Sequence, residues 1–193
     1  MFQTKKRTNH ILWIAQAGLL IALMVVVQLL TFAIPKSVPL VGQLFTGSLV
    51  NLVLIVGAGT LGLPGTAAAA ILSPILAFAF GQMAFPQLIP VIAVGNLILV
   101  AITWIFFSHD GAHYQPASLV IDTTGIILGA VVKFLFLWLM VSKWIVPLLF
   151  NTKPIVANMI SFMFSWPQLV TAIIGGFLSL LVLTIVRNSR IYL

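Results

Sequence analysis

Residues 45–81 constrain the fold more than any other stretch, because they contain no charged residue and only one short break, at Gly62, Pro64 and Gly65. Small residues lie at close intervals on both sides of the break, which allows another helix to approach closely. A spanning helix needs ~20 apolar residues. The stretch therefore predicts two membrane helices joined by a tight turn, over about 44–62 and 66–83.

The whole chain has the same character, with 62% hydrophobic and 6% charged residues. Soluble domains carry about a quarter charged residues, so the composition predicts an integral membrane protein made of one compact domain. The net charge of +7 would indicate nucleic acid in a soluble protein. In a membrane protein such cations orient helix ends and contact lipid phosphate, so we expect the bilayer as a partner and no nucleic acid.

Apolar runs separated by polar or proline-containing segments predict an all-α integral membrane fold with six transmembrane helices. The predicted spans are about 11–34, 44–62, 66–83, 90–107, 118–141 and 167–186, with tails at 1–10 and 188–193. Six spans place both termini on one side. The tails carry more cations than the opposite connections, which contain Lys36, Lys143 and Lys153, so both termini are predicted to be cytoplasmic.

Residues 142–165 do not resemble a clean span, since lysines, prolines and asparagines interrupt the apolar pattern. We expect a long outer connection that lies partly in the membrane interface. Aromatic residues lie in or beside it: Trp138, Trp144, Phe162, Phe164 and Trp166. They fit either an interfacial belt or a stacking wall over a ligand. Lysines on this side leave an anionic or phosphate-bearing ligand at the outer face open.

Two ionisable residues, Asp122 and Lys133, lie within the fifth predicted span. They share a helix face but stand about 16 Å apart along the axis, so they cannot pair with each other. Asp122 is near the predicted inner end, where an interfacial position is expected. Lys133 is nearer the middle, where a functional role and snorkelling toward the interface are both open.

The sequence offers little for catalysis. His109, Asp110 and His113 resemble a metal site, but the nearby Gly and Pro oppose the helix that would place them on one face, so no metal is expected. There is no Cys, no P-loop and no nucleophile with a base, which predicts neither an enzyme nor ATP hydrolysis by this chain. We expect no permanently bound cofactor.

Small residues at helical spacing predict close helix contact on two spans. They are Ala15, Gly18 and Ala22 on the first span, and Ala70, Ser73 and Ala77 on the third. From this pattern alone, packing within the protein and docking of a partner are both open.

Several short runs together resemble the substrate-binding S components of energy-coupling factor (ECF) vitamin importers. They are residues 45–51 (FTGSLVN), Ser73-Pro74, 77–81 (AFAFG), 93–96 (AVGN), 133–136 (KFLF) and 168–176 (QLVTAIIGG). Their order and spacing cover most of the chain after the basic tail. The sequence is most similar to the branch that includes cobalamin and pantothenate binders.

The resemblance implies a six-helix S component of a prokaryotic plasma membrane that binds a vitamin at its outer end. It further implies docking through spans one to three on a transmembrane T subunit, which two cytoplasmic ATPases drive. The family's Ala-xxx-Ala docking motif stands here as Gly18-xxx-Ala22. That departure keeps small residues but leaves the register of docking open.

Cobalamin is the favoured substrate at this point, because the aromatic outer connection suits a large ligand, and pantothenate is next. Candidate ligand contacts, chosen by their predicted position in the outer half, are Gln82, Asn96, Lys133, Trp138, Trp144, Phe162 and Gln168. Two other classes stay open: a membrane assembly protein, and a stand-alone secondary transporter, which the lack of charged proton relays and broken helices disfavours.

Overall fold

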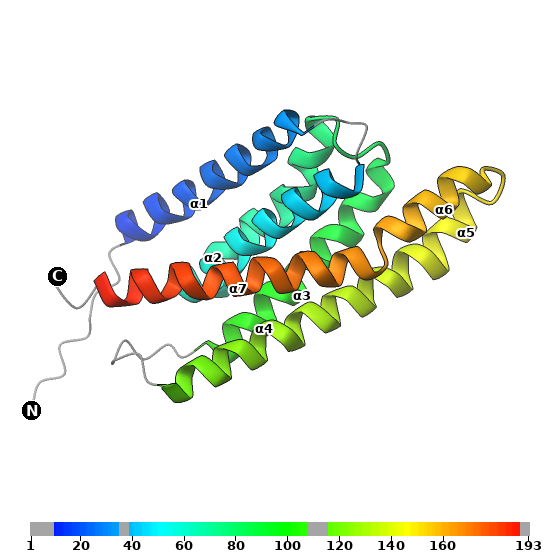
Figure 1. The fold of residues 1–193 in the computed structure, drawn as a ribbon. Coiled ribbons are helices and arrows are strands. Elements are labelled where there is room, and N and C mark those ends of the chain that lie inside the picture. Colours follow the sequence, from blue (N-terminus) through cyan, green and yellow to red (C-terminus); the bar gives the residue numbers. More distant parts are fainter. Residues whose placement is uncertain (1–9, 35–38, 108–115, 190–193) are drawn as a thin grey trace, which may run out of the picture.

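A computed structural model describes residues 10–34, 39–107 and 116–189, and all regular secondary structure in these residues is helical (Figure 1). The elements in chain order are α1 (His10–Leu30), η1 (Thr31–Ala33), α2 (Pro39–Ala79), η2 (Pro86–Leu88), α3 (Ile89–Phe106), α4 (Pro116–Leu137), η3 (Trp138–Ile145), α5 (Val146–Leu149), α6 (Pro154–Met163) and α7 (Trp166–Ser189). The prediction of an all-helical fold is confirmed.

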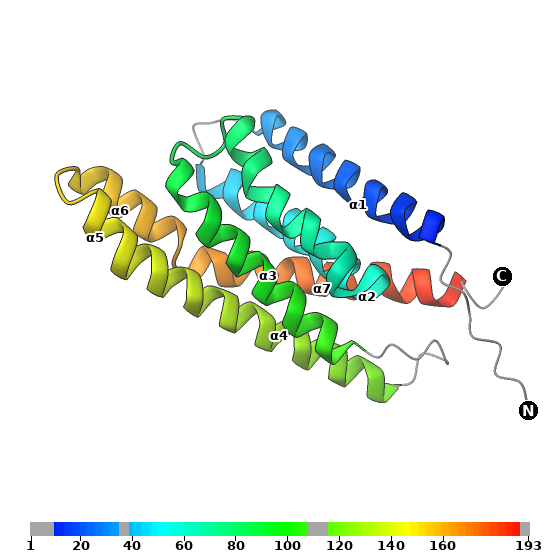
Figure 2. The same cartoon turned by 180° about the vertical axis from the view of Figure 1, so that it is seen from behind.

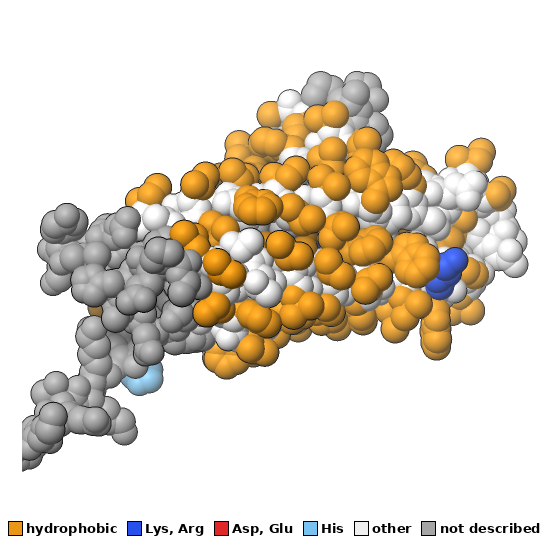
Figure 3. Space-filling model, turned by 60° about the horizontal axis from the view of Figure 1, so that its bottom comes forward, with side chains coloured by type: hydrophobic (Ala, Val, Ile, Leu, Met, Phe, Trp, Pro, Cys, Tyr) orange, Lys and Arg blue, Asp and Glu red, His pale blue; other side chains and the backbone are white. Residues whose placement is uncertain are grey.

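Five helical stretches in the described residues are long and apolar enough to cross a membrane. They are His10–Ala33, Leu40–Ala79, Pro86–Phe106, Leu119–Leu149 and Pro154–Val186. The face in Figure 3 is mostly apolar: hydrophobic side chains cover its described part, and the basic side chain seen there lies near the end formed by α5 and α6. Lipid-exposed surface of this kind supports a multi-pass membrane protein.

Most of residues 45–81, the stretch that most constrains the fold, lies in α2. This helix is 41 residues long and broken at Gly62. Gly62 has φ 74° and ψ −176°, a backbone conformation that residues with a Cβ rarely adopt. The chain reverses there, and the arms 39–61 and 63–79 run back along each other (Figures 1 and 2). A break was predicted here, but α2 begins at Pro39 and ends at Ala79, earlier at both ends than expected.

Residues 142–165, which were predicted to form a long outer connection, are helical over most of their length. α4 continues into η3, a π-helical segment over Trp138–Ile145, and then into α5. After a short turn, α6 begins at Pro154, where proline is tolerated in a first helical turn. The segment is therefore a helical hairpin that extends α4 and α7 at one end of the bundle (Figures 1 and 2).

The two ends of the bundle differ. The start of α1 and the end of α7 lie at the same end (Figure 1). At the opposite end lie η1, the start of α2, the segment from Phe80 to η2, and the hairpin of α5 and α6 (Figures 1 and 2). This second end therefore gathers segments from almost every part of the sequence.

In the middle of the bundle, α7 packs closely against the first arm of α2. A Cβ at Gly175 would overlap the backbone oxygen of Ser48 and lie 2.8 Å from both the Asn51 Cβ and the Leu52 backbone nitrogen. Backbone atoms cannot yield as a side chain can. The contact therefore requires glycine at position 175 for steric reasons.

We expect Gly175→Ala to destabilise the protein by about 1–3 kcal/mol, because the added methyl group overpacks a rigid contact. Thermal unfolding in detergent measures this change. Gly18→Ala is the matched control, since a Cβ there meets nothing within 4 Å and alanine favours helix. Equal melting temperatures for the two variants would contradict the proposed packing.

Candidate functional site

A cavity of about 520 Å³ lies at the end of the bundle that carries η1 and α6. Its walls come from α1, η1, both arms of α2, residues 80–85, η2, α3, α4, α6 and the start of α7. The polar lining residues are Gln28, Thr31, Gln43, Thr46, Asn51, Ser73, Gln82, Asn96, Lys133 and Gln168. This volume is within the range that binds drug-sized molecules.

Lys133 on α4 is the only charged side chain among the described residues that line the cavity. It is 3% exposed, and its Nζ donates hydrogen bonds to Asn51 Oδ1 (2.6 Å) and Asn96 Oδ1 (2.7 Å). An ammonium has three donors. Both acceptors that Lys133 has in the described part of the chain are neutral amide oxygens. One of the three donors of the ammonium therefore has no acceptor there.

The two asparagines hold this ammonium in place through further hydrogen bonds. Asn51 Nδ2 donates to Thr171 Oγ1 on α7 (3.3 Å), and Asn96 Nδ2 donates to the Ala70 backbone oxygen in the second arm of α2 (3.3 Å). Because each amide nitrogen is engaged, each amide oxygen points toward Lys133. The network joins both arms of α2 to α3, α4 and α7.

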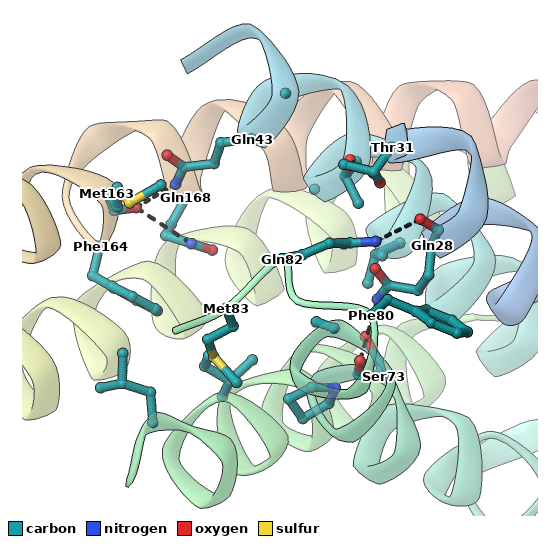
Figure 4. Close-up of a pocket in the computed structure, with 18 of the residues that line it drawn as sticks. Gln28, Thr31, Gln43, Ser73, Phe80, Gln82, Met83, Met163, Phe164 and Gln168 are labelled. Atoms are coloured by element: carbon teal, nitrogen blue, oxygen red, sulfur yellow. Dashed lines mark hydrogen bonds between the residues drawn. The ribbon is translucent and has the colours of Figure 1, made fainter. Parts of the chain in front are cut away.

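Four glutamines form a second polar group in the cavity (Figure 4). Gln28 Nε2 donates to the Ser73 backbone oxygen, and Gln82 Nε2 donates to the Gln28 backbone oxygen. Gln43 and Gln168 both donate to the Met163 backbone oxygen. The bonds tie α1 to α2 and residue 82, and tie α2 and α7 to the end of α6, so the cavity walls are cross-linked.

Two amide oxygens in this group are buried and accept no hydrogen bond from the described residues: Gln28 Oε1 and Gln43 Oε1. Both side chains line the cavity, and Gln28 is only 2% exposed. A buried acceptor without a donor carries a desolvation cost of about 1–3 kcal/mol. The residues around the site thus include two unpaired acceptors as well as an unused donor.

The remaining lining is mostly apolar. Phe80, Met83, Phe85, Met163 and Phe164 lie around the glutamines. Phe85 packs edge to face on Phe150, with 4.7 Å between ring centroids, which fixes one wall. Methionine side chains adapt to irregular shapes. The cavity therefore suits a partly apolar molecule with a small number of polar groups.

Four of the predicted ligand contacts line this cavity: Gln82, Asn96, Lys133 and Gln168. The three predicted aromatic contacts do not. Trp144 is 68% exposed, Phe162 is exposed and packs on Trp166, and Trp138 lies under the Lys143 ammonium at 5.0 Å. The π-helical turn and the hairpin of α5 and α6 direct these side chains away from the cavity.

Several polar lining residues were missed because they lie within the predicted spans and were treated as part of the apolar pattern. They are Gln28, Thr31, Thr46 and Asn51, with Gln43 just before the second predicted span; Ser73 also lines the cavity but was assigned to docking. The amides among these residues could have been identified from the sequence, because amide side chains are rare in apolar helices. An amide that is buried in a membrane helix needs a polar partner.

The predicted docking residues divide into two groups. Ala15, Gly18 and Ala22 lie exposed on α1. Ala70 is 0% exposed and Ser73 is also buried, so neither can contact a partner directly, and Ala77 lines the cavity. The small residues of the second α2 arm pack inside the bundle, because that arm lies against α3 and carries the carbonyl groups that accept from Asn96 and Gln28.

Asp122, which was predicted to lie at the membrane interface, is buried within the bundle, with 0% exposure. His109, Asp110 and His113, as well as Lys36 and the basic residues of the first tail, lie outside the described residues.

No family model matches the chain, and comparisons with curated proteins and with solved structures find no match.

We expect Asn96→Leu to lower the stability of the protein by about 1–3 kcal/mol, because it leaves the buried Lys133 ammonium with one acceptor fewer. Thermal unfolding measures the loss. The control is Thr124→Val, since Thr124 is exposed and its hydroxyl bonds only within its own helix. A loss no larger than the control's would show that the network contributes little.

Proposed function

We propose that this chain is the substrate-binding S component of an ECF-type importer, and that the cavity is its vitamin site. The observation that carries the proposal is a drug-sized cavity at one end of an apolar helical bundle, with Lys133 and its two asparagines on its wall. A binding subunit needs such a site and needs no catalytic group. The resemblance of the sequence to S components supplies the role.

The proposed topology has six crossings with both termini in the cytoplasm. The α2 arms, 39–61 and 63–79, would each make one crossing, because at 1.5 Å per residue each is about 25–35 Å long, close to the ~30 Å hydrocarbon core. The break at Gly62 would then lie at the cytoplasmic surface. The cavity would open on the outer side, opposite the end where α1 begins and α7 ends (Figure 1).

Among vitamins, the geometry favours pantothenate over cobalamin. The tryptophans that favoured cobalamin lie outside the cavity, and a corrinoid is much larger than the drug-sized ligands that fit about 520 Å³. Pantothenate is small and anionic, with hydroxyl and amide groups. Cobalamin remains the second candidate, bound in a more open form of the same end.

The proposed partners are a transmembrane T subunit and two cytoplasmic ATPases, with docking on α1. Of the five long apolar stretches in the described residues, the one formed by α1 and η1 is the least buried. Its exposed Ala15, Gly18 and Ala22 would admit a close helix. Ala70 and Ser73 would support this surface from inside the bundle and would not touch the partner.

Reconstitution in liposomes tests the role. We expect vitamin uptake only when the T subunit, both ATPases and ATP are present. Uptake by the chain alone, without ATP, would indicate a secondary transporter. The absence of both specific vitamin binding and vitamin uptake would indicate an assembly protein.

We expect Ala22→Trp to reduce co-purification of the T subunit and ATP-dependent uptake at least about tenfold, since a large side chain prevents close helix contact, while vitamin binding to the isolated chain is unchanged. Leu181→Trp is the control, because Leu181 is exposed on a different helix, α7. Loss of vitamin binding in Ala22→Trp, or equal loss of uptake in both variants, would place docking elsewhere.

A further inference from the structure

The Lys133 ammonium is buried without a negative partner among the described residues. Its acceptors are the neutral oxygens of Asn51 and Asn96, and Asp122 lies about 16 Å away along the same helix. A buried charge in a membrane domain is normally paired, because desolvation is costly. Since Lys133 also lines the cavity, an anionic ligand group there would complete its third hydrogen bond and balance its charge.

The unused glutamine oxygens specify a different part of the ligand. Gln28 Oε1 and Gln43 Oε1 are acceptors only, and the Nε2 atoms of the same side chains are held by the Ser73 and Met163 backbone oxygens. Figure 4 shows these side chains on the cavity wall. A ligand that satisfies them must present hydroxyl or N–H donors. The glutamines lie on α1 and at the start of α2, whereas Lys133 lies on a different helix, α4.

From these two observations we propose that the cavity selects a small organic anion, with one carboxylate bound by Lys133 and hydroxyl or amide N–H donors bound by Gln28 and Gln43. The proposal rests on the proposed function and narrows it to one class of vitamin. The apolar wall formed by Phe80, Met83 and Phe164 would contact the part of the molecule between these groups.

The test is a binding titration with matched pairs of vitamins that differ only in the carboxylate. Pantothenate is compared with its alcohol, pantothenol, and biotin with its amide, with cobalamin and thiamine as ligands of other classes. We expect one carboxylate to bind at least about tenfold more tightly than its uncharged partner, which is the range of a charge-assisted hydrogen bond. Equal affinity within each pair, or no binding of any carboxylate, overturns the proposal.

Variants of the chain test which residues produce the preference for the carboxylate. Lys133→Met should abolish the preference for the carboxylate over its uncharged partner, while Lys143→Met, which changes an exposed lysine, should retain it. Gln28→Met should weaken both members of a pair by a similar factor. If Lys133→Met does not fold, the comparison of paired ligands on the unmodified chain still decides. A preference that survives in folded Lys133→Met overturns the assignment.

The outcomes separate this inference from the proposed function. Tight binding of cobalamin or thiamine with ATP-dependent uptake would leave the importer role intact and refute the ligand class. A preference for the carboxylate, combined with uptake that does not require the T subunit and ATP, would support the ligand class and refute the importer role.

Discussion

The hydrogen bonds of Lys133 to Asn51 and Asn96 are the interaction on which the arrangement of this bundle depends. They bring together three residues that are 37 to 82 positions apart in the chain, and the amide nitrogens extend the network to α7 and to the second arm of α2. Apolar helix surfaces in lipid have weak preferences for one partner over another. A polar network fixes their register, because a shifted helix would leave buried polar groups without partners.

The same residues explain how much could be predicted from sequence. The helical class and the break in residues 45–81 follow from composition and from glycine and proline, which are local properties. Lys133 and Asn96 could be selected because a polar residue in an apolar span is rare. Asn51 and Gln28 carry the same signal, but their partners are distant in the chain. Which of these side chains meet depends on how the helices pack.

The errors at the α5 and α6 end have a different physical cause. Prolines and asparagines within residues 142–165 indicated a break, but Pro154 occupies a first helical turn, where it is compatible with helix. The π-helical segment Trp138–Ile145 also has a wider turn than an α-helix. Helical spacing therefore no longer predicts which face a side chain occupies, and Trp144 points outward. The glutamines that line the site came from outside this segment.

The uncompensated ammonium has a consequence for the energetics of the protein in its bilayer. An empty cavity leaves the Lys133 ammonium beside neutral amide oxygens in low-dielectric surroundings, whereas an anionic ligand would place a negative charge next to it. Occupancy would then change the electrostatic self-energy of the whole bundle, even with the helices unmoved. Occupancy by an anion would therefore raise the free energy of unfolding of the bundle, because such a ligand binds only the folded chain.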